Sequence, residues 1–234
     1  MTKIIGIVSG KGGTGKTTVA INLALAMNEF GHNVILLDAD LRSADIGLLL
    51  GVPTSISTLH DALAGQKDIT EIVYHHPSGL NFIPGSIAAH TMPNADMRPL
   101  LSRLRGTAEI IVMDLPAGLH QEVFSPLKEA DESIIVTNPE LPAVTDALKI
   151  IALFEQHGKY VRGVVVNRYS SDAMPLENIQ EMLGHDILAV IPEDEHVKKS
   201  VHLRCPVTYA YPLAPASVSF KNMAASLLGK SAVH

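Results

Sequence analysis

One glycine-rich stretch near the N-terminus carries the residues best suited to chemistry. Its sequence is Ser9-Gly10-Lys11-Gly12-Gly13-Thr14-Gly15-Lys16-Thr17-Thr18, and it contains the spacing G-x-x-x-x-G-K-T of a phosphate-binding loop. Glycines lack Cβ atoms, so the backbone can turn tightly and direct successive N–H groups at one anion. Lys16 would reach the β- and γ-phosphates, and the Thr17 hydroxyl would ligate Mg²⁺. The stretch predicts a nucleotide site, against the alternative of a glycine-rich turn that binds nothing.

Two flanking segments have the character needed to position this loop. Residues 4–8 form an apolar run, which predicts a strand, and residues 19–27 place apolar side chains at helical spacing. A strand, a glycine-rich turn and a helix in that order are the context of a phosphate-binding loop. The helix is expected to begin near Lys16 and to add the positive end of its dipole at the phosphate position. The expected binding residues of the loop are Gly12, Gly13, Thr14, Gly15, Lys16, Thr17 and Thr18.

Aspartates follow two further apolar runs. Residues 33–37 precede Asp38 and Asp40, and residues 110–113 precede Asp114. Carboxylates at the carboxyl ends of parallel strands face the ligand crevice. Asp40 is therefore a candidate to hold the water shell of Mg²⁺ or to orient the attacking water, and Asp114 to stand beside the metal. A structural alternative for Asp40 is that it caps the next segment.

Lys11 occupies a position at which an ordinary phosphate-binding loop requires no charge. A lysine there can lie over its own phosphates, project towards a neighbouring molecule, or be simply solvated. The stretch Lys11–Thr17 resembles the deviant Walker A signature of the MinD/ParA ATPases, and the resemblance extends from Thr2 to about Gly229. It implies that Lys11 contacts the nucleotide of the partner subunit in an ATP-dependent homodimer. It also implies that Asp40 is the catalytic aspartate of switch I.

Three later stretches extend this resemblance. Residues 114–118 are similar to switch II, in which the Gly118 N–H would sense the γ-phosphate; Leu115 departs from the small polar residue common there. The next residues of the chain include His120, which we interpret as an exposed histidine at a helix start. The run Thr137–Glu140 is similar to MinD more than to ParA.

The resemblance also implies a base-binding pocket. Asn167 ends an apolar run, and an asparagine side chain can donate to and accept from an adenine edge simultaneously. The family places this asparagine on the base, with Arg168 beside it. A following loop would close the pocket, although its acidic residues also suit a plain helix N-terminus. The loop consists of Pro192, Glu193 and Asp194.

Composition limits the class of protein. The chain has 234 residues, 47% of them hydrophobic, and a formal net charge of −6, which argues against a globally basic nucleic-acid binder. Cys205 is the only cysteine, so neither an intramolecular disulfide nor a cysteine-pair metal site is expected, and relatives that carry iron–sulfur clusters or nickel are disfavoured. Without an evident signal segment or a long apolar run, the expected location is cytoplasmic, with peripheral membrane association left open.

The expected fold is a doubly wound α/β P-loop NTPase domain over residues 1–234. It has a mostly parallel sheet of seven or eight strands with helices on both faces. Smaller expectations are a helix near residues 69–74, a surface loop at His75-His76, and an edge element starting at Pro206-Val207. Ser217 is expected to cap the last helix. Only residues 230–234 follow this helix, too few for the amphipathic helix by which MinD proteins bind membranes, so either that device is absent or a longer segment has been removed.

Together these patterns predict a Mg²⁺-dependent ATPase that dimerises on ATP and acts in spatial organisation. Its expected cellular role is to place the division site or to position cellular machinery, and its expected partner is a protein activator or cargo. Its turnover is expected to be slow until a partner completes the site. The alternatives are a ParA-like ATPase for DNA partition and an ATP-dependent scaffold with negligible turnover.

Overall fold

The predicted sheet is present and has eight strands within the described residues. The computed structural model describes residues 2–53, 55–87, 96–118 and 126–232. The strand order is β3-β4-β2-β5-β1-β6-β7-β8. The strands are β1 (Lys3–Val8), β2 (Val34–Asp38), β3 (Tyr74–His75), β4 (Asn81–Ile83), β5 (Ile110–Asp114), β6 (Glu132–Thr137), β7 (Val161–Tyr169) and β8 (Ile187–Pro192).

Strand pairing brings the ends of the expected functional strands together. Every neighbouring pair is parallel except β3 and β4, which are antiparallel. Strand β1 lies between β5 and β6, and β5 also pairs with β2. In this register Asp114 stands opposite Ile7 on one side and Asp38 on the other. The two aspartates therefore meet at the edge of the sheet from which the phosphate loop departs.

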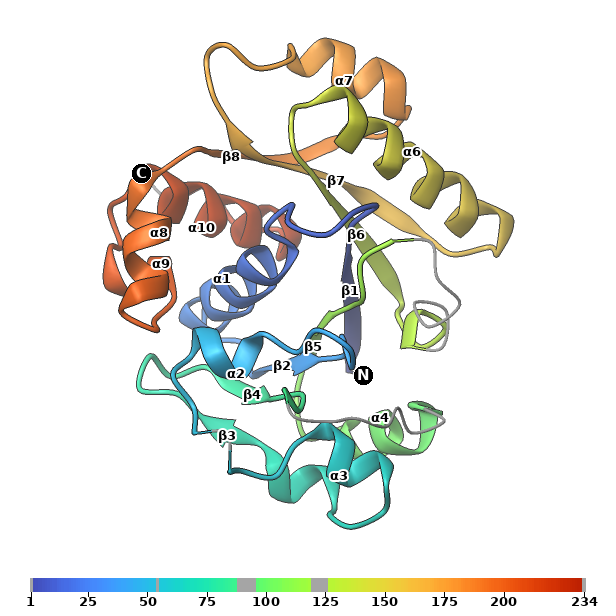
Figure 1. The fold of residues 1–234 in the computed structure, drawn as a ribbon, viewed down its shortest axis with the longest axis vertical. Coiled ribbons are helices and arrows are strands. Elements are labelled where there is room, and N and C mark those ends of the chain that lie inside the picture. The colour runs from blue at the N-terminus through green and yellow to red at the C-terminus, as the bar shows by residue number, and fades with distance from the viewer. Residues whose placement is uncertain (1, 54, 88–95, 119–125, 233–234) are drawn as a thin grey trace.

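Helices cover both faces of the sheet, which confirms the doubly wound prediction. Figure 1 shows α1 (blue) and α10 (red) beside one another on one face, where they are in contact, and α6 on the opposite face. No helix in the described ranges combines the length and apolar character needed to cross a membrane. The helices are α1 (Lys16–Glu29), α2 (Ile46–Leu49), α3 (Leu59–Leu63), α4 (Arg98–Leu104), α6 (Leu141–Gln156), α7 (Leu176–Leu183), α8 (Glu195–His202), α9 (Val207–Ala210) and α10 (Pro215–Leu227), with a 3-10 turn η1 (Ile69–Ile72).

The alternation of side chains along β1 divides the core into two layers. Ile5 and Ile7 pack with the apolar residues of α1 and α10, whereas Ile4 and Val8 pack with those of α4 and α6. All four side chains are buried, because a parallel sheet covered on both sides has no solvent-facing row. The central strand is thereby held from both faces, and the loop that follows it starts from a rigid support.

Four smaller expectations differ from the structure. Tyr74 and His75 form β3, and not the end of a helix and a surface loop, because η1 stops at Ile72. Pro206-Val207 opens the helix α9 and not an edge element. The last helix begins at Pro215, with Ala214 at its N-cap, so Ser217 lies inside the helix, and its buried hydroxyl has no hydrogen-bond partner among the described residues. Proline suits the first helical position because its fixed φ and missing N–H cost nothing there.

Two histidine rings are fixed between backbone groups. His60 in α3 accepts a hydrogen bond from the Ser86 N–H at Nδ1 (3.1 Å), and its Nε2 lies 3.1 Å from the Leu41 carbonyl oxygen. His76 accepts from the Ser78 N–H at 3.1 Å and bonds the Arg204 backbone. Burial is the main cause that lowers the pKa of both rings below the ordinary value of 6.5. The folded protein therefore favours the neutral rings.

We predict that these histidines make the protein less stable in mild acid. In the unfolded chain both rings take up protons below about pH 6.5, whereas in the folded chain uptake needs a lower pH. The contribution of the two rings to the unfolding free energy is complete above about pH 6.5 and is lost as the pH falls. Urea denaturation at a series of pH values should show a smaller rise of the unfolding free energy with pH in the double variant His60→Gln/His76→Gln than in the wild type. Identical slopes would contradict the assignment; comparing slopes cancels the opposite effect of buried carboxylates.

Candidate nucleotide-binding site

The loop between β1 and α1 has the conformation that its glycines predict. Gly13 and Gly15 adopt φ values of 80° and 86°, in the left-handed region, and Gly15 is the N-cap of α1. A Cβ on Gly10 would collide with the backbone of Asp146 in α6. The loop is therefore built for glycine at three places, twice by its backbone angles and once by close packing against α6.

The loop has open space beside two of its glycines. A Cβ built on Gly12 or Gly13 would meet no atom of the described residues within 4 Å. The Thr14 hydroxyl is buried and has no hydrogen-bond partner within the described structure. A buried polar atom without a partner is costly unless a ligand satisfies it. Together with the start of α1, these residues fit the phosphates of a nucleotide.

Lys16 is buried beside two of the expected aspartates. Its Nζ lies 2.6 Å from Asp114 Oδ1 and 3.9 Å from Asp40 Oδ2. The Lys16 side chain is 8% exposed and that of Asp114 1%. The Thr17 hydroxyl also bonds the Asp114 carboxylate. The structure thus brings the loop lysine, the loop threonine and both carboxylates into one cluster, as the sequence predicted.

Negative charge exceeds positive charge in this cluster. Burial raises the pKa of Asp114, which Lys16 and Thr17 partly offset. Burial and the charge of Asp114 raise the pKa of Asp38 well above its ordinary value, and one buried Asp38 oxygen has no hydrogen-bond partner in the part of the chain that the structure describes. Burial and the charges of Asp114 and Asp40 raise the pKa of Asp45. Within the described residues no three histidine, cysteine or acidic side chains are placed to hold a metal ion by themselves.

The two oxygens of Asp40 have different environments. Oδ1 accepts a hydrogen bond from the Ser43 N–H at 3.1 Å, which closes a turn over residues 40–43. Oδ2 is the atom directed towards Lys16. The carboxylate therefore caps the following segment and also faces the phosphate loop, so the two interpretations of this residue are compatible. Its catalytic role stays a prediction.

The switch II stretch is partly engaged with the phosphate loop. The Gly118 N–H donates to the Ser9 carbonyl oxygen at 2.9 Å. A contact from this N–H to a γ-phosphate would therefore require the two segments to separate, and it stays a prediction. Leu115 is fully buried and fills the space left by Gly6, where a Cβ would lie 2.9 Å from its Cδ1. This packing explains why an apolar residue stands at position 115; His120 lies outside the described residues.

The expected base-binding residues line one cleft with the phosphate loop. Asn167 donates to the Thr14 carbonyl oxygen at 2.7 Å and is buried, and Arg168 donates to the Gly13 carbonyl oxygen at 3.1 Å. These bonds tie the end of β7 to the loop. Sequence reasoning missed that α8 lines this cleft. Its apolar residues Val197 and Val201 lie four apart, which is a helical signal. The cleft is lined by Gly15, Thr18, Asn167, Arg168, Pro192, Glu193, Asp194, Val197, Lys198 and Val201.

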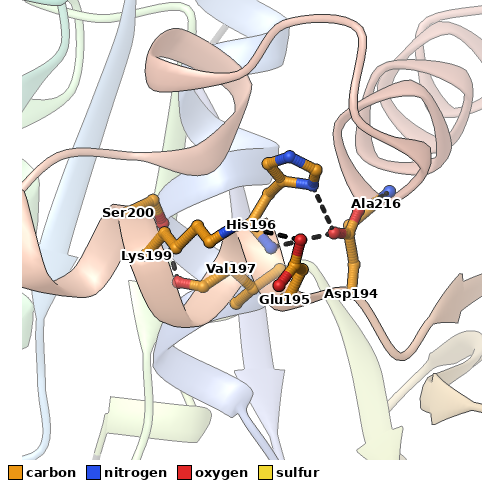
Figure 2. Close-up of polar contacts among 7 residues, drawn as sticks. All are labelled: Asp194, Glu195, His196, Val197, Lys199, Ser200 and Ala216. Atoms are coloured by element: carbon orange, nitrogen blue, oxygen red, sulfur yellow. Dashed lines mark hydrogen bonds and ion pairs between the residues drawn. The ribbon is translucent and has the colours of Figure 1, made fainter.

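Asp194 turns its carboxylate towards two helix starts (Figure 2). Oδ1 accepts from the N–H and from Nδ1 of His196, at 2.9 and 2.8 Å, and Oδ2 accepts from the Ala216 N–H at 3.1 Å. Burial acts to raise the pKa of Asp194, but these hydrogen bonds outweigh it and the net shift is downward. The acidic loop is thus a helix N-terminus for α8 and also a wall of the cleft. Asp194 fastens that wall to α10.

Lys11 lies at the outer side of the loop. Its Nζ is 3.7 Å from Glu140 Oε2, at the N-cap of α6. The Lys11 side chain is 35% exposed and that of Glu140 63% exposed. Lys11 therefore pairs with the N-cap of α6 rather than with Asp40 or Asp114, and its side chain is partly exposed.

The fold and the site together define a P-loop nucleotide-binding protein. A phosphate loop leaves the central strand of a mostly parallel sheet, an aspartate ends the neighbouring strand, and a cleft lined in part by Asn167 and Arg168 opens beside the loop. The family model described as "CobQ/CobB/MinD/ParA nucleotide binding domain" matches residues 5–204. The chain belongs to this family.

Individual relatives are similar over nearly the whole chain. An uncharacterized ATP-binding protein of Methanocaldococcus jannaschii is 38% identical, with 98% of this chain and 89% of the relative covered. The septum site-determining protein MinD of Pyrococcus horikoshii, solved with Mg-ADP, is 35% identical with a TM-score of 0.90, covering 97% of this chain and 96% of that one. A MinC:MinD cell division protein complex of Aquifex aeolicus contains a chain 26% identical with a TM-score of 0.89, covering 100% and 98%.

We predict that Asp194→Ala weakens both the fold and the base cleft. Loss of an N-cap carboxylate costs about 1–2 kcal/mol of unfolding free energy, and the α8 wall loses its link to Ala216. Urea denaturation should show this loss, and calorimetry should show weaker binding of ADP. The matched control is Glu155→Ala, which removes an exposed pair with His185 and does not line the cleft. Equal stability of the two variants would contradict the role of Asp194 in joining α8 to α10.

Proposed function

We propose that this protein is a Mg²⁺-dependent ATPase that dimerises on ATP and works as a slow switch in spatial organisation. The observation that carries the proposal is the double-lysine loop, in which Lys16 is buried against Asp114 and Asp40 while Lys11 stands at the surface. The family match supports ATP binding. Placement of a division site, as in the relatives named for septum determination, is the role we favour.

Nucleotide binding follows from the groups gathered at the loop. Lys16 exchanges its partner Asp114 for oxygens of the β- and γ-phosphates, and the Thr14 hydroxyl gains a partner. Asn167 and Arg168 face the base, with residues 192–194 closing the cleft. The P. horikoshii MinD solved with Mg-ADP supports the same ligand here.

Hydrolysis needs a positioned water and compensation of the charge that develops on the phosphoryl group. Asp40 would orient the water. Thr17 would be the residue that holds Mg²⁺ directly, and Asp114, released from Lys16, would support its water shell. When bound, the metal would supply the positive charge that this acidic cluster lacks. Lys11 leaves Glu140 and contacts the nucleotide of the partner subunit. Because each site then depends on a second chain, turnover is slow without an activator.

The two segments in contact with the loop provide the switch. Gly118 donates to Ser9 in the present arrangement, and exchange of that bond for a γ-phosphate oxygen would move switch II. Loss of the γ-phosphate would reverse the movement and release the dimer. The MinC:MinD complex supports a protein partner for this family.

A DNA-partition role is the competing function. The net charge of −6 disfavours it. ATPase rates measured with anionic vesicles, with duplex DNA and with neither separate the two functions. Stimulation by DNA alone would favour partition over division-site placement. A scaffold would show ATP binding with no turnover under any of these conditions.

We predict that Lys16→Ala lowers the affinity for Mg-ADP about 10- to 100-fold, as expected for loss of charge-assisted hydrogen bonds to phosphate. Isothermal titration calorimetry in magnesium buffer measures the affinity, and EDTA should weaken binding to the wild type. Lys199→Ala is the control, since this exposed lysine of α8 pairs with Glu195 and is not among the residues that line the cleft. Absence of adenine nucleotide binding by the wild type would overturn the proposed function.

We predict that Lys11→Ala binds ATP as a monomer. The dimer is measured by light scattering with Mg-ATP in an Asp40→Ala background, which blocks hydrolysis. Lys11→Ala should abolish the shift to twice the mass while ADP affinity changes little. The matched control is Lys149→Ala, an exposed lysine that also pairs with a carboxylate. Normal dimerisation in this background, together with normal hydrolysis by the single variant Lys11→Ala, would refute a role of this lysine across the interface.

A further inference from the structure

The segment that carries Asp40 has little regular structure of its own. It runs from the end of β2 at Asp38 to the start of α2 at Ile46. Within it Asp40 accepts the Ser43 N–H, and the Ile46 N–H donates to Asp38 at 3.2 Å. These local bonds shape the turn. The Ala39 N–H also donates to the Asp114 carbonyl oxygen at 2.9 Å, which ties the start of the segment to β5. A further group from outside the segment holds the backbone at Leu41.

His60 is such a group. Its Nε2 lies 3.1 Å from the carbonyl oxygen of Leu41, in the middle of the Asp40–Ser43 turn. A carbonyl oxygen only accepts, so Nε2 carries the proton. Nδ1, left without a proton, accepts the Ser86 N–H at 3.1 Å. One neutral ring therefore joins the Asp40 turn to the loop that follows β4.

The elements around the ring are themselves held in place. Thr58 and Asp61 form a capping box at the start of α3, and the Leu59 N–H donates to the Pro84 carbonyl oxygen at 2.8 Å. Gly85 approaches the Asp40 segment closely, since a Cβ there would lie 2.6 Å from the Cβ of Ala44. The His60 residue is only 8% exposed. The imidazole ring is thus buried and held in one position by its hydrogen bonds.

We propose that His60 is a positioning residue for ATP hydrolysis: its bond to the Leu41 carbonyl oxygen holds the Asp40 carboxylate against the phosphate loop. The proposal rests on the proposed function, in which Asp40 orients the attacking water. His60 touches neither the phosphate loop nor the base cleft, whose lining residues come from other elements. Its loss should therefore reduce the rate of the chemical step and leave nucleotide binding intact. Misplacement of a reacting group by an ångström can slow catalysis about 100-fold.

Asparagine and glutamine variants separate the two bonds of the ring. The amide of asparagine ends near the place of Nδ1, so His60→Asn can keep the Ser86 bond and loses the Leu41 bond. The amide of glutamine extends to the place of Nε2, so His60→Gln can donate to Leu41 and loses the Ser86 bond. His60→Leu removes both. Each variant can be compared at matched folded fraction, determined by thermal unfolding.

The experiment measures single-turnover hydrolysis of Mg-ATP and the affinity for Mg-ADP in each variant. His60→Asn and His60→Leu should lose about 10- to 100-fold in the hydrolysis rate, with ADP affinity within about twofold of the wild type. His60→Gln should recover most of the rate. His76→Leu is the matched control, because that ring also bonds two backbone groups but lies away from the Asp40 turn; its rate should equal that of the wild type.

The outcomes separate this inference from the proposed function. Wild-type rates in His60→Asn and His60→Leu would overturn the positioning role while ATP hydrolysis by the protein stands. A loss in His60→Gln as large as in His60→Leu, or a parallel loss of ADP affinity, would also overturn it and would indicate a general structural effect. A wild-type protein that binds ATP without hydrolysing it would overturn both.

Discussion

The buried ion pair between Lys16 and Asp114 is the interaction on which the rest of the site depends. Both charges have left water, which is costly unless they are paired and hydrogen-bonded, and removing either partner leaves an uncompensated charge. The 2.6 Å contact requires the first turn of α1 to stand beside the last residue of β5. The glycine loop is the connection that permits this, because it lets the chain reverse over the end of β1. A phosphate that binds Lys16 in place of Asp114 enters a site that is already arranged around a charged partner.

The parallel sheet explains why residues so distant in sequence share this edge. Parallel strands all end on the same side, and β1 lies between the two halves of the sheet, where connections diverge. The loop after β1 therefore meets Asp114 from one side and Asn167 from the other. The base cleft needs β7 and β8 in addition, and α8 completes it. The phosphate loop and the proposed base cleft are thus placed by strand order, while the side chains supply the chemistry.

The parts of this arrangement that depend on local pattern could be predicted from the sequence, and the parts that depend on packing could not. The loop, the buried strands and Asp114 follow from spacing and hydrophobic runs. The partner of the Asp194 carboxylate, Ala216, lies 22 residues away and is set by the docking of α10, so no local signal predicts it. The bond from His60 to Leu41 is likewise a tertiary contact. Leu115 departs from the family pattern because it packs against Gly6, a complementarity visible only in three dimensions.

The two lysines of the loop differ in burial, and this difference matches the roles we assign to them. Lys16 is held in a dry cluster, where its charge stabilises whatever anion stands nearest. Lys11 pairs with Glu140 at 3.7 Å in water, and exposed pairs of this kind contribute at most about 1 kcal/mol. Breaking the pair with Glu140 therefore costs little free energy. A residue that must reach a second molecule needs such a weak contact. A lysine buried as deeply as Lys16 could not make that move, so the loop divides tight binding and reach between two side chains.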